Sequence, residues 1–250
     1  MTRIRQLWRY AAVPAALAAF LVTSCSGSSS TSTTERSKRP YEPRIRPADF
    51  GGPVDNPYFP LIPGSRWVYE GKQGDASERT VVEVTPDTKA ILGVTNVVVH
   101  DTVSKDGTVT EDTFDWYAQD REGNVWYFGE DTKEFENGVV ASTEGSWEAG
   151  VDGAKAGIIM KARPRVGVAY RQEYYRGHAE DFAQVLGKSQ SVTVPAGTYH
   201  DIVKTKEFTP LEPNLLEHKY YARGVGVVRE VTVKGGSGRV QLLEYTRGPG

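Results

Sequence analysis

Hydrophobic and polar residues alternate along short segments of this chain, and glycine, proline, asparagine and aspartate separate the segments. In residues 108–118 the alternation puts different sets on the two faces of an extended chain: Phe114, Trp116 and Ala118 against Thr113, Asp115 and Tyr117. A period of two is typical of a β-strand with one buried face. The same signals predict strands at residues 66–70, 80–84, 96–103, 124–129, 169–175, 191–194, 199–208, 218–222, 227–233 and 240–245.

Turn residues connect several of these strands directly. Lys105-Asp106-Gly107 separates two of them, and Glu136-Asn137-Gly138 suggests a further hairpin. The one candidate helix is short, about residues 179–186. We therefore expect a mainly β fold, an antiparallel meander curled into a barrel or half-barrel, with at most one or two short helices.

The first 25 residues have a different pattern. Arginines precede a 12-residue apolar segment, 11–22, which is too short to span a hydrocarbon core of about 30 Å. Val22 and Ser24, at the third and first positions before Cys25, resemble the lipobox of bacterial lipoproteins, in which the cysteine is diacylated and the peptide is cut just before it. The competing interpretations are ordinary secretory cleavage near Ser24, with Cys25 an incidental thiol, or an uncleaved anchor.

This resemblance implies a signal peptide over residues 1–24 and a lipid on Cys25, the chain's single cysteine. Two acyl chains anchor a protein stably. Residues 25–54 are first Ser/Thr-rich and then basic and Pro-rich, which predicts a disordered tether. Residues 55–250 follow as a single β-rich domain. We expect the protein to be extracytoplasmic and lipid-anchored to the bacterial cell membrane.

Charge and cysteine content exclude some functions. Residues 1–49 hold 8 of the 30 basic and 3 of the 32 acidic residues, which leaves residues 50–250 with a net charge of −7. A domain this acidic is a poor nucleic-acid binder. Because Cys25 lies outside the domain, the domain folds without disulfides and has no thiol nucleophile.

Known catalytic motifs are absent from the sequence. It has no His-Glu-x-x-His helix, Gly-x-Ser-x-Gly elbow or phosphate-binding loop, so no catalytic residue, metal site or cofactor is predicted. Two stretches combine aromatic rings with titratable groups and are candidates for ligand binding: Trp147, Glu148 and Asp152 in a Gly-rich loop, and Glu173, Tyr175 and His178 further on. The alternative for the second stretch is a solvated turn whose tyrosines pack and whose acidic residues begin a short helix.

A wider family resemblance rests on several stretches, which lie at residues 116–120, 123–131, 145–154, 170–175, 179–181, 194–199, 211–213, 217, 219–221 and 224–226. These resemble a family of uncharacterised extracytoplasmic bacterial proteins over most of residues 56–233. The resemblance implies location and a β-rich fold, and it assigns no catalytic residue. The general shape of that family also resembles the curved, open sheets of periplasmic lipoprotein carriers.

Three functions remain open at this point. The first is a membrane-anchored binding or interaction module of the cell envelope, with a hydrophobic small molecule, a glycan or an envelope protein as partner. The second is a hydrolase that works through paired carboxylates such as Glu148, Asp152, Glu173 or Glu180. The third is a purely structural envelope component. An apolar groove would favour a carrier, a polar cleft with paired carboxylates an enzyme, and a filled interior a structural role.

Overall fold

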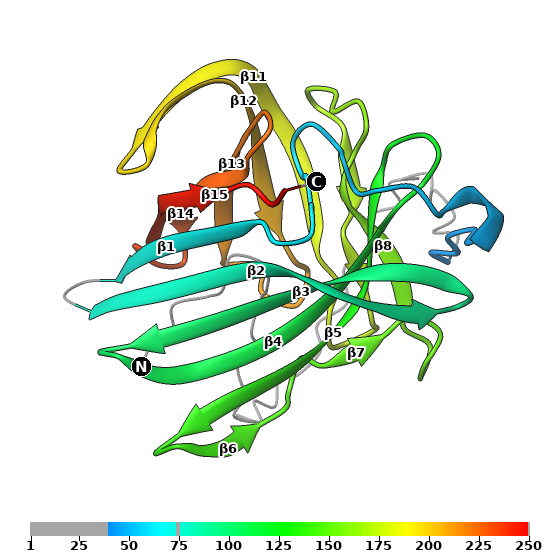
Figure 1. The fold of residues 1–250 in the computed structure, drawn as a ribbon, viewed down its shortest axis with the longest axis horizontal. Coiled ribbons are helices and arrows are strands. Elements are labelled where there is room, and N and C mark those ends of the chain that lie inside the picture. The colour runs from blue at the N-terminus through cyan, green and yellow to red at the C-terminus, as the bar shows by residue number, and fades with distance from the viewer. Residues whose placement is uncertain (1–39, 74–75, 250) are drawn as a thin grey trace, which may run out of the picture.

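The structure is a computed structural model that describes residues 40–73 and 76–249 (Figure 1). Cys25, the predicted signal peptide and the first part of the predicted tether lie outside the described residues. In chain order the elements are η1 (Pro47–Asp49), β1 (Arg66–Gln73), β2 (Ala76–Ile91), β3 (Val94–Lys105), β4 (Thr108–Gln119), β5 (Val125–Glu136), β6 (Val139–Ser142), β7 (Trp147–Glu148), β8 (Lys155–Met160), β9 (Ala169–Arg171), β10 (Glu173–Tyr174), β11 (Phe182–Val194), β12 (Gly197–Phe208), β13 (Leu216–Ala222), β14 (Gly226–Lys234) and β15 (Arg239–Thr246).

These strands form one large antiparallel sheet in the order β10-β8-β5-β4-β3-β2-β1-β15-β14-β13-β12-β11-β9, with β6 and β7 also paired to β5. Most neighbours are consecutive in the chain, so the expected mainly β, antiparallel fold is confirmed. The sheet is strongly curved (Figure 1). Its hydrogen-bonded order is linear, with β10 at one end and β9 at the other, so the sheet is not closed into a barrel.

The turn residues behave as their chemistry predicts. Asp106 and Asn137 have φ values of 50° and 53°, and each is followed by a glycine that also has a positive φ. Two successive positive φ values match the right-handed twist of two hairpin strands. The Asp-Gly and Asn-Gly pairs therefore fix the β3–β4 and β5–β6 hairpins locally.

The helix expected at residues 179–186 is wrong. Most of this segment is the beginning of β11, which pairs with β9 on one side and β12 on the other. Ala183 and Val185 are buried while their neighbours are more exposed, which is a strand period. Hydrogen bonds to two neighbouring strands and burial on one face outweigh the local helix preference here.

The strand expected at residues 169–175 is present in two parts. β9 pairs with β11, and β10 pairs with β8, so the two strands belong to opposite ends of the sheet. Gln172 lies between them, and its N–H donates to the carbonyl of Asp181 at 2.7 Å. The two ends of the sheet are thus covalently joined through one buried residue.

Residues 40–55, which we call the strap, lie within the expected tether except for Asp55, but they pack against the domain (Figure 1, blue). The hydroxyl of Tyr41 donates to the carbonyl of Ala156 in β8 at 2.9 Å. Phe50 forms a β-bridge with Asp120, and Val54 is buried. The expectation of a disordered tether is therefore not met for the strap, because its apolar side chains find partners on the sheet.

On one face of the sheet, side chains lie close together although their strands are far apart in the hydrogen-bonded order. Burial raises the pKa of Tyr69 in β1 well above its usual value, and Asp101 of β3 and Glu230 of β14 raise it further. Side chains on both sides of β1 therefore converge. We call this the inner face. Among its buried residues are Asp101, Asp115, Glu130, Glu207, Lys219 and Glu230.

Candidate functional site

The first predicted stretch, Trp147, Glu148 and Asp152, is not brought together. Trp147 in β7 lies opposite Glu130 in β5 and is buried on the inner face. Its neighbour Glu148 points to the other side of the strand, where its carboxylate pairs with Lys89 Nζ at 2.7 Å. Asp152 is exposed in a turn with a φ of 49°. Only Trp147 therefore joins the inner face.

The second predicted stretch is divided in the same way. Glu173 in β10 is buried and lies close enough to raise the pKa of Tyr117 and Tyr127. Tyr175 and His178 stack on each other in a turn outside the strand, with ring centroids 4.3 Å apart. The imidazole therefore does not share a site with the Glu173 carboxylate.

The two residues that do turn inward, Trp147 and Glu173, meet around one ring. Tyr127 has Trp147 edge-on at 5.3 Å and is stacked on Tyr117 at 4.7 Å. The Tyr127 hydroxyl donates to Asp115 Oδ1 at 2.5 Å. We call Tyr117, Tyr127, Asp115, Glu130, Trp147 and Glu173 the Tyr127 cluster.

The electrostatics of the Tyr127 cluster are strongly acidic. Burial raises the pKa of Tyr127 well above its usual value, and Asp115, Glu130 and Glu173 raise it further. Asp115 and Glu130 are direct cross-strand partners, an arrangement that is unfavourable for two like charges. Asp115 was not expected in a site, because an aspartate in an alternating strand is normally solvent-exposed.

A second cluster of polar side chains lies on the inner face, on strands β12–β14 and β9. Lys219 Nζ is 3.1 Å from Glu207 Oε2 and 3.6 Å from Glu230 Oε2, and all three side chains are buried. Glu207 Oε1 also accepts hydrogen bonds from Tyr221 and Thr205, at 2.9 and 2.8 Å. We call Lys219, Glu207, Glu230, Tyr221, Thr205 and Tyr170 the Lys219 cluster.

Protonation in the Lys219 cluster follows from burial and neighbours. Burial raises the pKa of Glu230 well above its usual value, and Glu217 raises it further, against the lowering effect of Lys219. Burial lowers the pKa of Lys219, but the nearby carboxylates, Glu207 first, outweigh it and hold the pKa above its usual value. Lys219 therefore keeps its proton beside Glu207, 3.1 Å away, and Glu230 retains a proton more readily than an exposed glutamate.

At one end of the inner face, the partly buried Glu78 predicts a change of protein stability with pH. Burial raises its pKa to about 7, Lys105 lowers it and Glu111 raises it. The folded state binds this proton more tightly than the unfolded chain does. The contribution of the Glu78 proton to the free energy of unfolding is therefore fully present below about pH 4.5 and is lost as the pH rises through 7. Glu78→Gln is expected to unfold at a higher temperature than the wild type at pH 8 and at the same temperature at pH 4. Glu136→Gln, at an exposed position, is the control. Equal changes of unfolding temperature in both variants would contradict the raised pKa of Glu78.

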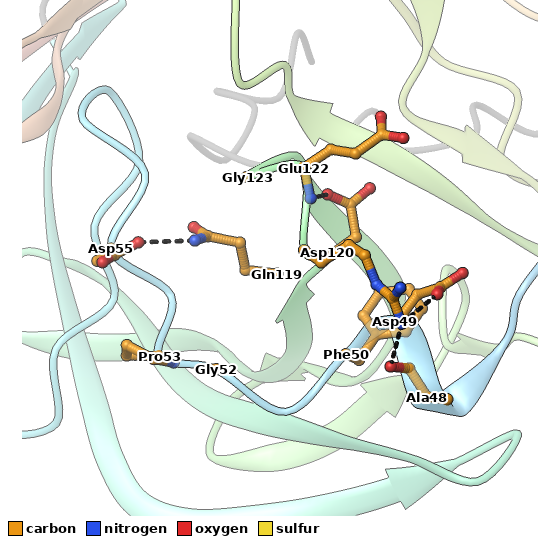
Figure 2. Close-up of a pocket in the computed structure, with 11 residues that line it drawn as sticks. Ala48, Asp49, Phe50, Gly52, Pro53, Asp55, Gln119, Asp120, Glu122 and Gly123 are labelled. Atoms are coloured by element: carbon orange, nitrogen blue, oxygen red, sulfur yellow. Dashed lines mark hydrogen bonds and ion pairs between the residues drawn. The ribbon is translucent and has the colours of Figure 1, made fainter.

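A surface pocket lies between the strap and the β4–β5 turn (Figure 2). Its volume is about 410 Å³, and it is lined by Ala48, Asp49, Phe50, Gly52, Pro53, Asp55, Gln119, Asp120, Arg121, Glu122 and Gly123. Its aspartates are already engaged: Gln119 donates to Asp55 at 2.6 Å, and Arg121 pairs with Asp49 at 2.8 Å. The pocket lies where the strap crosses the β4–β5 turn, and these carboxylates already have partners within it.

Among the described residues, no group of three His, Cys, Asp or Glu side chains is arranged to hold a metal ion. Within residues 40–73 and 76–249, no helix has the length and hydrophobicity needed to cross a bilayer.

No protein-family model matches this chain, and no curated protein matches it. Among solved structures, it is similar to a protein from Bacteroides fragilis described as exported, with a YmcC-like fold, at 15% identity and a TM-score of 0.46 over 76% of this chain and 99% of the other. It is also similar to a protein from Parabacteroides distasonis described as a lipoprotein, at 15% identity and a TM-score of 0.43 over 76% and 98%.

Proposed function

We propose that this protein is a bacterial cell-envelope lipoprotein, held at the membrane by diacylated Cys25, and that its curved sheet is a binding or interaction module. The anchor rests on the lipobox-like residues before Cys25. The binding role rests on one observation, the buried carboxylates on the inner face. A sheet with a purely structural role gains nothing from them, since buried ionic groups are often no more stable than apolar residues of similar volume.

The inner face also separates the alternatives. Carboxylates such as Asp115 and Glu130 are unsuited to contact with an aliphatic chain, so a hydrophobic small molecule is a poor partner for this face. The hydrolase candidates Glu148, Asp152, Glu173 and Glu180 lie on different faces and loops, and Glu180 is 3.7 Å from Arg171. The geometry therefore favours a polar partner over the carrier and enzyme alternatives.

The anchor is tested by Cys25→Ser. Without the thiol no acyl chain can be attached, so the variant is expected to move from the membrane fraction to the soluble fraction, while wild type leaves the membrane only in detergent. Ser28→Ala, in the same stretch, is the control and is expected to stay with the membrane. Mass spectrometry of the mature N-terminus provides a second measurement, and retention of Cys25→Ser in the membrane would refute lipid anchoring.

A further inference from the structure

We propose that the outer face of strands β12–β15 docks on an anionic phospholipid bilayer. This inference rests on the membrane anchor proposed above and concerns the face of the sheet opposite to the buried carboxylates. Two observations carry it. Four basic side chains lie there without a carboxylate partner among the described residues, and ring contacts link them to the strap, where the predicted tether reaches the domain. We call these four side chains the basic face: Lys204, Lys206, Arg229 and Arg239.

Strand register puts the four side chains on one side of the sheet. Two rows of directly paired residues cross β12–β15: Lys204–Tyr220–Arg229–Gln241 and Lys206–His218–Val231–Arg239. Directly paired residues of an antiparallel sheet point to the same side. The row between them contains Lys219 and Glu230, which are buried on the inner face. Because successive residues of a strand point to opposite faces, the basic face lies on the outer side.

The basic face is not balanced by acidic side chains. Neither row contains a carboxylate, and no member of the basic face forms an ion pair with another described residue. Arg229 donates a hydrogen bond to the carbonyl of Thr193, which leaves its charge uncompensated. Toward β1, the first acidic residue is Glu70, which lies opposite Gln241, with its carboxylate 3.9 Å from Lys72 Nζ. This surface is therefore basic although the domain as a whole is acidic.

The like charges lie close enough to repel one another. Burial lowers the pKa of Arg229, and Arg239 lowers it further. Burial likewise lowers the pKa of His218, and Lys204 and Lys206 lower it further. A surface of phosphate groups offsets this repulsion, because lysine and arginine both bind phosphate. The charge of the basic face is thus complementary to anionic lipid headgroups.

Aromatic contacts connect the basic face to the strap. Lys206 Nζ lies 4.8 Å from the ring of Phe208, which is stacked on Phe182 at 5.5 Å. The guanidinium of Arg171 lies 4.2 Å from the Phe182 ring and 5.3 Å from the ring of Tyr41. Because Tyr41 is the second described residue, the predicted tether meets the domain beside the basic face.

This placement favours a bilayer over a soluble acidic partner. Only the 14 residues 26–39 separate Cys25 from the strap, and they span at most about 50 Å when fully extended. A lipid on Cys25 would therefore keep the basic face near the membrane. A soluble acidic protein needs no such proximity between its binding surface and the tether.

The test uses the full chain with Cys25→Ser, which cannot be acylated, so that binding does not depend on the anchor. Co-sedimentation at low salt measures its affinity for vesicles of equal parts phosphatidylglycerol and phosphatidylcholine, and for vesicles of phosphatidylcholine alone. We expect stronger binding to the anionic vesicles and loss of that difference at high salt, because salt screens exposed charges. Since the segment before the strap is also basic, substitutions must show which charges bind.

Matched substitutions separate the basic face from general surface charge. Lys204→Gln combined with Lys206→Gln is expected to weaken binding to the anionic vesicles about twentyfold, because each basic residue near an anionic surface contributes about fivefold. Lys105→Gln combined with Lys133→Gln removes the same charge from β3 and β5 and should leave binding unchanged. Arg239→Gln, at an exposed position where a change of fold is not expected, should weaken binding about fivefold.

Three results would each overturn the proposal. They are equal affinity for the neutral and the anionic vesicles, equal weakening by the two double variants, and binding of polyglutamate in preference to the anionic vesicles, which would assign the basic face to an acidic polypeptide. High salt releases a protein held by charge but not one held by acyl chains. Retention of Cys25→Ser after a high-salt wash would therefore contradict the anchor alone, so the two failures are distinguishable.

Discussion

Replacing Lys219 with methionine is expected to lower the free energy of unfolding by about 3–5 kcal/mol, because it leaves a buried carboxylate without its ammonium partner. Lys219 Nζ lies 3.1 Å from Glu207 and 3.6 Å from Glu230, and its side chain is 5% exposed. Methionine retains most of the packing of the lysine stem. The loss therefore reports the charge, not a cavity.

Urea denaturation measures this loss of unfolding free energy. Two further variants show whether the loss comes from the charge. Lys219→Met combined with Glu207→Gln is expected to recover a substantial part of the stability, because the neutral amide still accepts from Tyr221 and Thr205. Lys72→Met, at a side chain that is 66% exposed, is the control and should change stability by less than about 0.5 kcal/mol. A loss below about 1 kcal/mol for Lys219→Met would show that the ammonium is not essential to the buried pair.

Deleting residues 40–49 is expected to lower the free energy of unfolding by about 2–3 kcal/mol, the sum of a few hydrogen bonds and cation–ring contacts. Tyr41 bonds to β8 through its hydroxyl, and its ring lies 5.3 Å from the guanidinium of Arg171 in β9. The same ring is 5.5 Å from Tyr174 in β10. The strap thus holds the two ends of the sheet at the point where Gln172 joins them.

Thermal melting followed by circular dichroism distinguishes the strap from the segment before it. Deleting residues 26–34 is the matched control, because this Ser/Thr-rich run has no apolar side chains to bury and its loss should leave the melting temperature unchanged. If both deletions give the wild-type melting temperature, the contacts of Tyr41 and Asp49 contribute no stability, and the tether extends as far as the sequence suggested.

Local signals predicted the strands well, because they depend only on neighbouring residues. Asp106-Gly107 and Asn137-Gly138 favour hairpin turns whatever the rest of the fold is. The error at residues 179–186 has the opposite origin. Most of that segment becomes part of β11 through hydrogen bonds to β9 on one side and β12 on the other. β12 comes after this segment in the chain. The pattern within residues 179–186 does not show that these two strands will flank it.

The candidate site could be predicted only in part. Residue type identified Trp147 and Glu173, both of which reach the inner face, but it also selected Glu148 and His178, which do not. The residues that the sequence analysis missed, such as Asp115 and Lys219, are charged positions in alternating strands. Such positions are usually solvent-exposed, and nothing in a single strand shows that both of its faces will be covered.

The sequence alone located most of the strands and the hairpin turns, and it predicts from the residues around Cys25 how the protein is held at the membrane. Only the tertiary structure decided which face of the sheet became the interior. A period of two defines two faces but not the direction in which the sheet curves. Curvature brought Asp101, Asp115, Glu130 and Glu173 together from strands that are distant in the chain, because side chains on the inside of a curved sheet converge while those on the outside diverge.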